Sequence, residues 1–287
     1  MAVHVSREDE EPSGDPASFI ASCDADTLEA IEDLVERPAG FGLTFSDALS
    51  TAQLHCLHDP TADTSETWEA WVAAMQVGAA MFAAAVVEQG TVECRIAHEM
   101  RTIPAIGVRH FTDAGSWVTA FWLAVVCRDQ KRMTQLAEVP VDLLRASGAV
   151  YDEYIYHWVD TLQTYWTERP GLGEKFTEAF QGTDPEVLRI ADRELMLKLL
   201  YPPLELFLHF LQRNEQEFNA ALVRAVQSHK EYWTKDEDRR QSTDGAVALG
   251  PLAMACLAHD VGMSIGVKSE YLPEHLLRRS WLGEFET

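Results

Sequence analysis

The sequence predicts a mostly α-helical fold of stacked helical hairpins, either a tetratricopeptide-like array or an irregular helical bundle, with one small β-hairpin. Apolar residues recur at helical spacing along most of the 287 residues. Residues that cap helix starts precede many of these stretches. Residues 91–106 instead alternate polar and apolar side chains with period two. We expect helix over more than about half of the chain, against about one third in an average globular protein.

The first residues differ in composition from the rest. Residues 1–16 are acidic, and Pro and Gly follow the acidic run, so we expect a poorly ordered tail. Residues 17–287 are predicted to form a single helical domain, which is long enough to bury a substantial core. Its first helix is expected after Asp24 or Asp26, and Ser46 is placed to cap the second.

A long helix and then the one hairpin are predicted next. Asp63 and Glu66 have the spacing of a capping box and predict a helix over Ser65–Gln89 that ends at a glycine. Thr91–Ile96 follows as a strand, and Arg101–Pro104 is its candidate partner. The proline that ends this second segment is typical of an edge strand.

Two pairs of predicted helices share the same kind of junction. One apolar helix ends at Arg128-Asp129 and another at Arg213-Asn214, 85 residues later. Each junction places Asp or Asn where the following helix needs an N-cap. Residues 184–186, Asp-Pro-Glu, predict one more helix start. The repetition favours stacked hairpins, although the tetratricopeptide consensus itself is absent.

The chain is strongly acidic, with 46 Asp and Glu against 23 Lys and Arg, a formal net charge of −23. Such a charge repels nucleic acid and anionic membranes. The most apolar stretches fall short of the roughly 20 residues that span a bilayer. We therefore predict neither a nucleic-acid nor a membrane partner. The charge would attract a basic protein, and solubility alone explains it equally well.

Cysteine usage and the N-terminus favour a cytoplasmic protein. The five cysteines are odd in number and widely spaced, with no Cys-x-x-Cys pair. This pattern argues against a disulfide framework or a zinc site and for a reducing compartment. The N-terminus lacks the basic and apolar regions of a signal peptide.

Closely spaced carboxylates and histidines raise the alternative of a metal-dependent enzyme. The three groups are Glu153, His157 and Asp160; Glu205 and His209; and His259 and Asp260. Di-iron bundles use Glu-x-x-His twice, and no pair here has that spacing. Histidines satisfied by hydrogen bonds explain the pattern more simply. Nucleophile-elbow, Walker and dinucleotide motifs are absent as well. We predict no catalytic residue, no metal, no cofactor and no enzymatic activity.

A segment rich in tyrosine and carboxylates supplies the candidate partner-binding residues. It holds more aromatic residues than one buried helical stripe can absorb: Tyr151, Tyr154, Tyr156, Trp158, Tyr165 and Trp166. Aromatic residues on a long helix usually belong to the core, but tyrosine is also enriched at protein interfaces. Tyrosine beside carboxylates suits a basic partner. The predicted contact residues are Asp152, Glu153, Tyr156, Asp160 and Glu205.

Several sequence blocks, in order along the chain, resemble one known family. In the C-terminal block a Gly-Pro pair opens an apolar helix that ends at His259-Asp260, and a second short helix starts at Pro273. Further blocks lie at residues 139–147, 151–160, 192–205 and 229–233. Together they resemble the immunity protein 49 family of bacterial polymorphic-toxin systems, over residues 65–285.

The resemblance implies a protein that binds a cognate toxin and neutralises it by stoichiometric occlusion. A net charge of −23 would suit a basic toxin, and a nuclease is one such toxin. The alternatives are a metal-dependent enzyme on a helical bundle and a helical scaffold for another intracellular protein. The metal content of the purified protein would distinguish the metal-dependent enzyme from an immunity protein. The identity of the neighbouring gene would distinguish the scaffold from an immunity protein.

Overall fold

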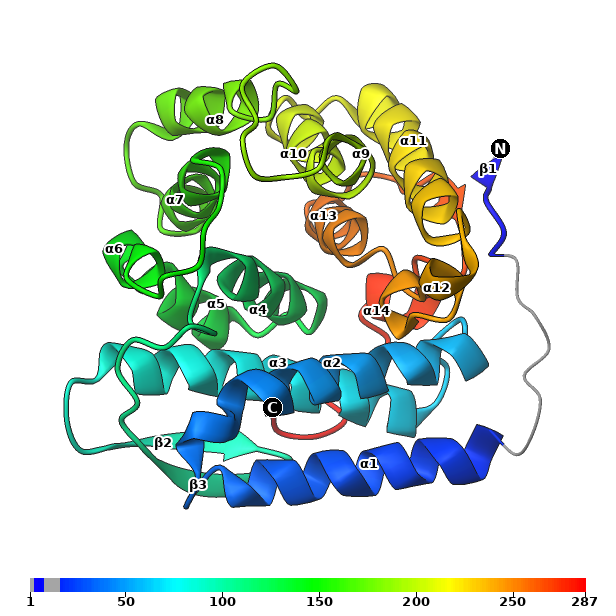
Figure 1. The fold of residues 1–287 in the computed structure, drawn as a ribbon. Coiled ribbons are helices and arrows are strands. Elements are labelled where there is room, and N and C mark those ends of the chain that lie inside the picture. The colour runs from blue at the N-terminus through cyan, green and yellow to red at the C-terminus, as the bar shows by residue number, and fades with distance from the viewer. Residues whose placement is uncertain (1–2, 8–15) are drawn as a thin grey trace.

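Helices dominate the computed structural model, which describes residues 3–7 and 16–287 (Figure 1). Helix makes up 61% of it, and the strands of the described residues form two small two-stranded sheets. The predicted mostly α-helical class is confirmed. The helices of eight residues or more are α1 (Pro16–Asp33), α2 (Phe41–His58), α3 (Ser65–Val86), α4 (Ala114–Val126), α5 (Gln130–Ala137), α7 (Tyr154–Trp166), α8 (Leu172–Gln181), α10 (Pro202–Leu211), α11 (Glu215–Trp233) and α13 (Leu249–Asp260).

Short elements connect these helices. They are β1 (Val3–His4), η1 (Pro38–Gly40), β2 (Thr91–Ile96), β3 (Glu99–Pro104), α6 (Val141–Arg145), α9 (Arg193–Leu195), η2 (Met196–Leu200), α12 (Glu237–Arg240), η3 (Thr243–Gly245), β4 (Val267–Lys268) and α14 (Glu274–Leu277).

The helices form a base and an arc (Figure 1). In the base, α2 packs along α3, α1 packs on α2, and β2 lies against α3. Above them, consecutive helices pack as hairpins: α4 with α5, α7 with α8, and α10 with α11. Helix α13 closes the arc by packing against α4, α10 and α11. This pairing matches the predicted helical hairpins.

Helix α3 is the central core helix. Gly78 allows α2 to approach closely, because a Cβ at this position would lie 2.6 Å from the Phe45 ring. The helix begins after Thr64, whose hydroxyl accepts a hydrogen bond from the N–H of Thr67. Length and composition alone would let α3 cross a bilayer, but 72% of its apolar window is buried inside the protein. The apolar residues of α3 thus form the core.

The predicted β-hairpin is confirmed. Strands β2 and β3 pair in antiparallel register, from Thr91 opposite Pro104 to Ile96 opposite Glu99. The two turn residues have φ angles of 50° and 67°, as a type I′ turn requires. Gln76 of α3 accepts a hydrogen bond from the first turn residue at 2.9 Å, which fixes the hairpin against the core.

Both predicted helix junctions have the same geometry. Arg128 and Arg213 adopt left-handed φ angles of 56° and 54°. Asp129 then caps α5 by accepting from the N–H of Arg132, and Asn214 caps α11 by accepting from the N–H of Glu217. The residue that ends one helix and the residue that caps the next are adjacent, so each hairpin turns within a few residues.

The expected poorly ordered tail is wrong for residues 3–7. β1 pairs in parallel with β4, at Val3 with Val267. The buried Arg7 guanidinium donates to the main-chain carbonyls of Cys56 and Ala246. Local composition cannot show these bonds, because they join residues far apart in the chain. The rest of the predicted tail, residues 1–2 and 8–15, lies outside the described residues.

Three predicted helix starts also differ. Helix α1 already begins at Pro16, ahead of Asp24. Helix α2 begins at Phe41, directly after a 3-10 turn opened by a proline, so Ser46 lies inside it. Residues 184–186 form a turn instead of a helix start, because Asp184 accepts a hydrogen bond from the N–H two residues later.

The chain widens into a π-helical turn at η2, just before α10. The N–H of Tyr201 donates to the carbonyl of Met196 at 2.8 Å, five residues back. Pro202 and Pro203 follow, and neither has the N–H that an α-helix would direct at the carbonyls of Lys198 and Leu199. Single π turns of this kind occur frequently at functional sites.

Candidate functional site

The carboxylate of Asp152, a predicted contact residue, binds its own chain. It accepts hydrogen bonds from the N–H groups of Arg189 (2.7 Å), Ile190 (3.2 Å) and Ala191 (2.8 Å). Desolvation acts to raise the pKa of Asp152, but these hydrogen bonds outweigh it and lower the pKa below its usual value. Asp152 therefore ties the α8–α9 connection to the start of α7.

Glu153 and Tyr156 both contact Arg145 of α6. The guanidinium donates to the two carboxylate oxygens of Glu153 at 2.9 and 2.6 Å, and lies 3.9 Å from the centre of the Tyr156 ring. The hydrogen bond from Arg145 is the main cause of the lowered pKa of Glu153. Tyr156 is only 6% exposed. Its ring therefore lies largely within the fold.

Asp160 and Glu205 lie on different helices, and each forms ion pairs with basic side chains of the same chain. Asp160 of α7 lies 2.6 Å from Lys175 and 3.7 Å from Arg169. Glu205 of α10 lies 2.6 Å from Arg224 of α11. The structure thus gathers four of the five predicted contact residues at α7 and leaves Glu205 on another hairpin. Partner binding by these residues stays a prediction.

The histidines of the metal alternative lie apart and have different surroundings. His157 contacts Glu178 at 3.1 Å, and His259 contacts Asp260 at 3.3 Å. The Nδ1 atom of His209 is buried and has no hydrogen-bond partner within the described ranges. Across residues 3–7 and 16–287, no group of three or more His, Cys, Asp or Glu side chains is arranged to hold a metal ion.

The buried cysteines are poor nucleophiles. All five cysteines are free, and Cys56, Cys127 and Cys256 are buried. Burial raises the pKa of Cys56 to about 12 and that of Cys256 to about 11, and it also raises the pKa of Cys127. Because the thiolate is the reactive form, these three side chains act as core residues at neutral pH.

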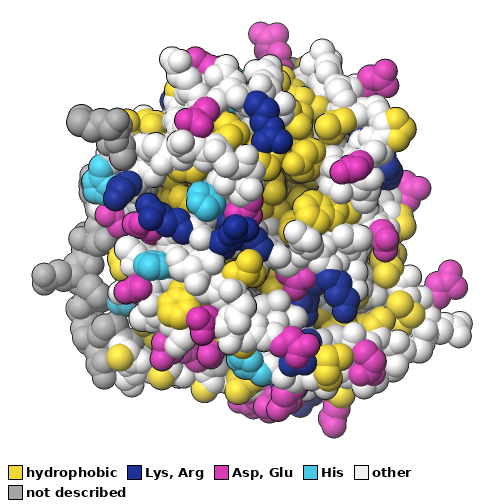
Figure 2. Space-filling view, turned by 180° about the vertical axis from the view of Figure 1, so that it is seen from behind, with side chains coloured by type: hydrophobic (Ala, Val, Ile, Leu, Met, Phe, Trp, Pro, Cys, Tyr) yellow, Lys and Arg dark blue, Asp and Glu magenta, His cyan; other side chains and the backbone are white. Residues whose placement is uncertain are grey.

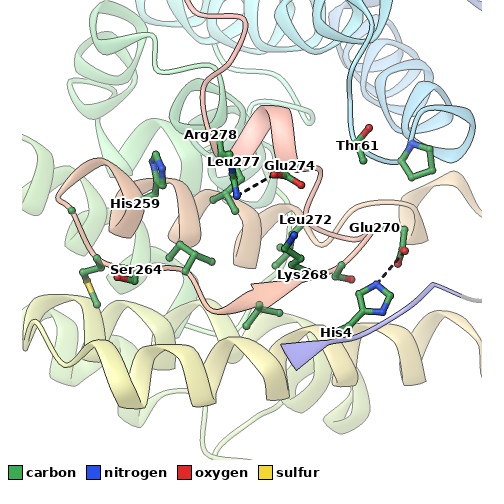
Figure 3. Close-up of a pocket in the computed structure, with 16 residues that line it drawn as sticks. His4, Thr61, His259, Ser264, Lys268, Glu270, Leu272, Glu274, Leu277 and Arg278 are labelled. Carbon is green, nitrogen blue, oxygen red and sulfur yellow. Dashed lines mark ion pairs between the residues drawn. The ribbon is translucent and has the colours of Figure 1, made fainter. Parts of the chain in front are cut away.

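A cavity of about 750 Å³ lies beside β1, β4 and α14 (Figure 3). Basic side chains point into this region from several elements, among them His4, Lys268 and Arg278. His4 lies 3.4 Å from Glu270, and Arg278 lies 3.0 Å from Glu274. The cavity is therefore polar, with most of its cations next to acids.

Charge is unevenly spread over the surface. On the face seen in Figure 2, Lys and Arg side chains gather in a band with His side chains beside them, and Asp and Glu side chains lie both next to this band and around it. A net charge of −23 therefore coexists with a local cluster of cations on this face.

A second cavity, of about 380 Å³, opens where the arc of helices meets the π turn. Its walls are mainly apolar, with Trp122 from α4, Trp158 from α7, Leu199 from the π turn and Trp233 from α11. The volume falls within the usual range of about 300–1,000 Å³ for ligand pockets. A mostly apolar cavity with a few polar groups is the common form of a binding site.

His229 fixes the polar edge of this cavity. Its Nε2 atom lies 2.9 Å from the carbonyl oxygen of Gly245. Burial lowers the pKa of His229 to about 4, although this hydrogen bond acts to raise it. The imidazole is therefore neutral at pH 7, and Nε2–H donates to the carbonyl. This bond holds the turn that carries the neighbouring Asp244.

The charged groups at the cavity differ in their pairing. Lys198 of the π turn contacts Glu194 at 3.6 Å and Glu231 at 3.2 Å. Asp244 is exposed, and its carboxylate has neither a hydrogen bond nor an ion pair within the described part of the chain. Sequence reasoning missed this site. The Pro202-Pro203 pair after a leucine-rich run was the one local signal for it.

The fold and its cavities define a mostly helical protein with cavities beside and between its helices. A sequence model of immunity protein 49 matches residues 59–276. The chain belongs to this family, which confirms the resemblance found in the sequence. No curated protein and no solved structure matches the chain. The matched region starts directly after α2, so α1 and α2 both precede it.

Proposed function

We propose that the chain is an immunity protein that binds a cognate bacterial toxin and neutralises it by stoichiometric occlusion. Membership of the immunity protein 49 family, over residues 59–276, carries this proposal. Occlusion requires a stable surface complementary to the toxin and no turnover. It makes no use of a nucleophile, metal or cofactor.

The architecture supports such a role. Aromatic and apolar side chains anchor most protein interfaces, and tight packing keeps the anchors in place before binding. Here Trp122 and Trp158, only 4% and 3% exposed, form the buried part of a cavity wall, and the half-buried Trp233 forms an accessible part of it. Hairpins locked by left-handed junction residues hold the walls. The protein therefore offers a preformed surface to a partner.

The charge of −23 supports a basic toxin, with a nuclease as one candidate. The cysteine pattern supports the cytoplasm as the place where the two proteins meet. Long-range attraction acts mainly on the association rate. Screening shortens its range from a Debye length of about 8 Å at physiological salt to about 3 Å at 1 M. The association rate should fall as salt rises, while dissociation changes much less.

Co-expression tests the proposal. The toxin encoded beside this gene is expressed in a sensitive host with and without the chain. Growth should be restored only when the chain is present, and stopped-flow binding at two salt concentrations should show the slower association at high salt. Continued growth arrest despite soluble chain contradicts the immunity function. If growth is rescued but the association rate does not depend on salt, the immunity function stands and charge steering is excluded from its mechanism.

A further inference from the structure

We propose that the cavity beside the π turn accepts an arginine side chain of the protein partner, with Asp244 pairing its guanidinium. The inference rests on the proposed function in taking the toxin as that partner. It differs from the surface predicted from sequence, which lies at the carboxylates of α7. The walls and the charge of the cavity support it independently.

The walls suit a planar cation on an apolar stem. Trp122 and Trp158 pack on each other, with ring centroids 6.1 Å apart and planes tilted by 53°, and form the buried part of the wall. The half-buried Trp233 and Leu199 supply the accessible apolar surface. An arginine packs its methylene groups on apolar walls and stacks its guanidinium on aromatic faces. Cations bind most strongly over tryptophan, within about 6 Å of the ring centre. Lysine lacks the planar group and would fit less well.

The charge at the mouth is available for a partner. Asp244 lines the cavity, is exposed, and has no pairing cation among the residues that the structure describes. Lys198 is the one Lys or Arg among the described residues of the wall, and Glu194 and Glu231 already contact it. A guanidinium in the cavity therefore meets an unpaired carboxylate, while the cation of the wall is already paired with acids.

The cavity is held in shape before binding. Pro202 and Pro203 impose the π turn that supplies Leu199 and Lys198 to the wall. The hydrogen bond from His229 to the carbonyl of Gly245 fixes the residue next to Asp244. Preorganised sites lose less conformational freedom on binding. The arginine would thus enter a cavity whose shape is already fixed before binding.

Two exposed apolar side chains lie next to segments that contribute to the cavity wall. Ile190 is 53% exposed and Leu197 is 42% exposed. Leu197 directly precedes Lys198 of the wall, and Asp152 holds Ile190 beside the start of α7. Exposed apolar groups around a polar centre mark protein interaction sites. These exposed apolar groups favour a protein partner over a free small cation.

The first test uses a small probe and needs no toxin. N-acetyl-arginine methylamide is titrated into the full chain while the indole N–H signals of Trp122, Trp158 and Trp233 are followed by NMR. A saturable shift is expected, with a dissociation constant of about 1 mM for a fragment of this size. The neutral citrulline analogue should bind more weakly. Equal binding of both probes, or no saturable shift, overturns the proposal.

Asp244→Asn removes the charge and keeps the shape, and Asp26→Asn is the matched control. Asp26 is an exposed carboxylate on α1, outside the family match. Asp244→Asn should weaken the affinity for the arginine probe about two- to fivefold, as expected for a solvent-accessible ion pair. Asp26→Asn should leave its affinity unchanged. Equal effects of the two substitutions contradict the assigned role of Asp244.

The second test uses the toxin. Asp244→Lys should speed dissociation of the complex, whereas the Asp26→Lys control should not. If wild type rescues growth and Asp244→Lys dissociates at the wild-type rate, the arginine site is refuted and the immunity function stands. If wild type fails to rescue but the arginine probe binds through Asp244, the toxin assignment fails and the arginine site stands.

Discussion

The start of α7 and the mouth of the cavity at Asp244 both present carboxylates beside aromatic rings, but they differ in what the carboxylates bind. Asp152 and Glu153 are engaged by N–H groups and a guanidinium of the same chain. Asp244 has no such partner within the described ranges. A carboxylate that must first give up internal hydrogen bonds gains little from a new partner. Pairing, more than composition, therefore decides which acids are free to bind a partner.

The largest loss of folding stability is expected when a buried, hydrogen-bonded charged side chain is replaced. Arg128 is 7% exposed and donates to Asp260 and to the carbonyls of Leu276 and Leu277. Arg128→Met should lower the free energy of unfolding by about 3–5 kcal/mol, because it leaves buried acceptors unpaired. Urea denaturation measures this. Arg213→Met, at the equivalent exposed junction, is the control, and an equal loss there would contradict the account.

The next largest effect is expected at His229, on the polar edge of the cavity, and it is a change in how stability depends on pH. His229 has a pKa of about 4 in the folded protein, against 6.5 ordinarily. Between these values the unfolded chain binds a proton that the folded protein does not, so stability falls as pH drops from 6.5 towards 4. The slope is at most about 1.4 kcal/mol per pH unit. His229→Gln should flatten it in urea titrations at pH 7 and 5. An unchanged slope would show that His229 is not buried.

A smaller effect is expected at the start of α7. Asp152→Asn should cost about 1 kcal/mol of unfolding free energy at pH 7, because three N–H groups lose a charged acceptor. The lowered pKa of Asp152 means that its contribution is present above the unfolded pKa of about 3.9 and is lost as pH falls through the folded value. The difference in unfolding free energy between wild type and variant should disappear at acidic pH. Urea denaturation at several pH values tests this.

The smallest effect on stability is expected at Asp244. Asp244→Asn should change the free energy of unfolding by less than about 0.5 kcal/mol, since an exposed side chain without partners contributes little. Urea denaturation beside Asp152→Asn gives the comparison directly. A loss as large as that of Asp152→Asn would mean that Asp244 is used by the fold and is not free.

Local patterns in the sequence predicted the features that depend on neighbours in the chain. Asp129 and Asn214 cap helices as expected, because an N-cap depends only on residues up to three positions ahead. The hairpin was predicted for the same reason. The pairing of Val3 with Val267 was not, since nothing near Val3 in the chain specifies a partner more than 260 residues away.

The candidate site was harder to predict because pairing and burial depend on tertiary packing. Nothing in the α7 sequence shows that Arg145 covers Tyr156, or that Asp152 faces residues 189–191. The cavity likewise joins Trp122 and Trp158 from separate hairpins. Family resemblance, by contrast, needs only the order of short blocks, so it was recognisable from the sequence and the family match confirms it.

Titration of toxin activity against the purified chain tests the central claim most directly. Increasing amounts of chain are added to a fixed amount of the neighbouring toxin, and the remaining activity is measured at equilibrium. Occlusion predicts a linear fall that reaches zero at a fixed whole-number ratio of chain to toxin. Undiminished activity at excess chain would contradict toxin binding. Complete inactivation by a small fraction of an equivalent would contradict occlusion, because it would require turnover.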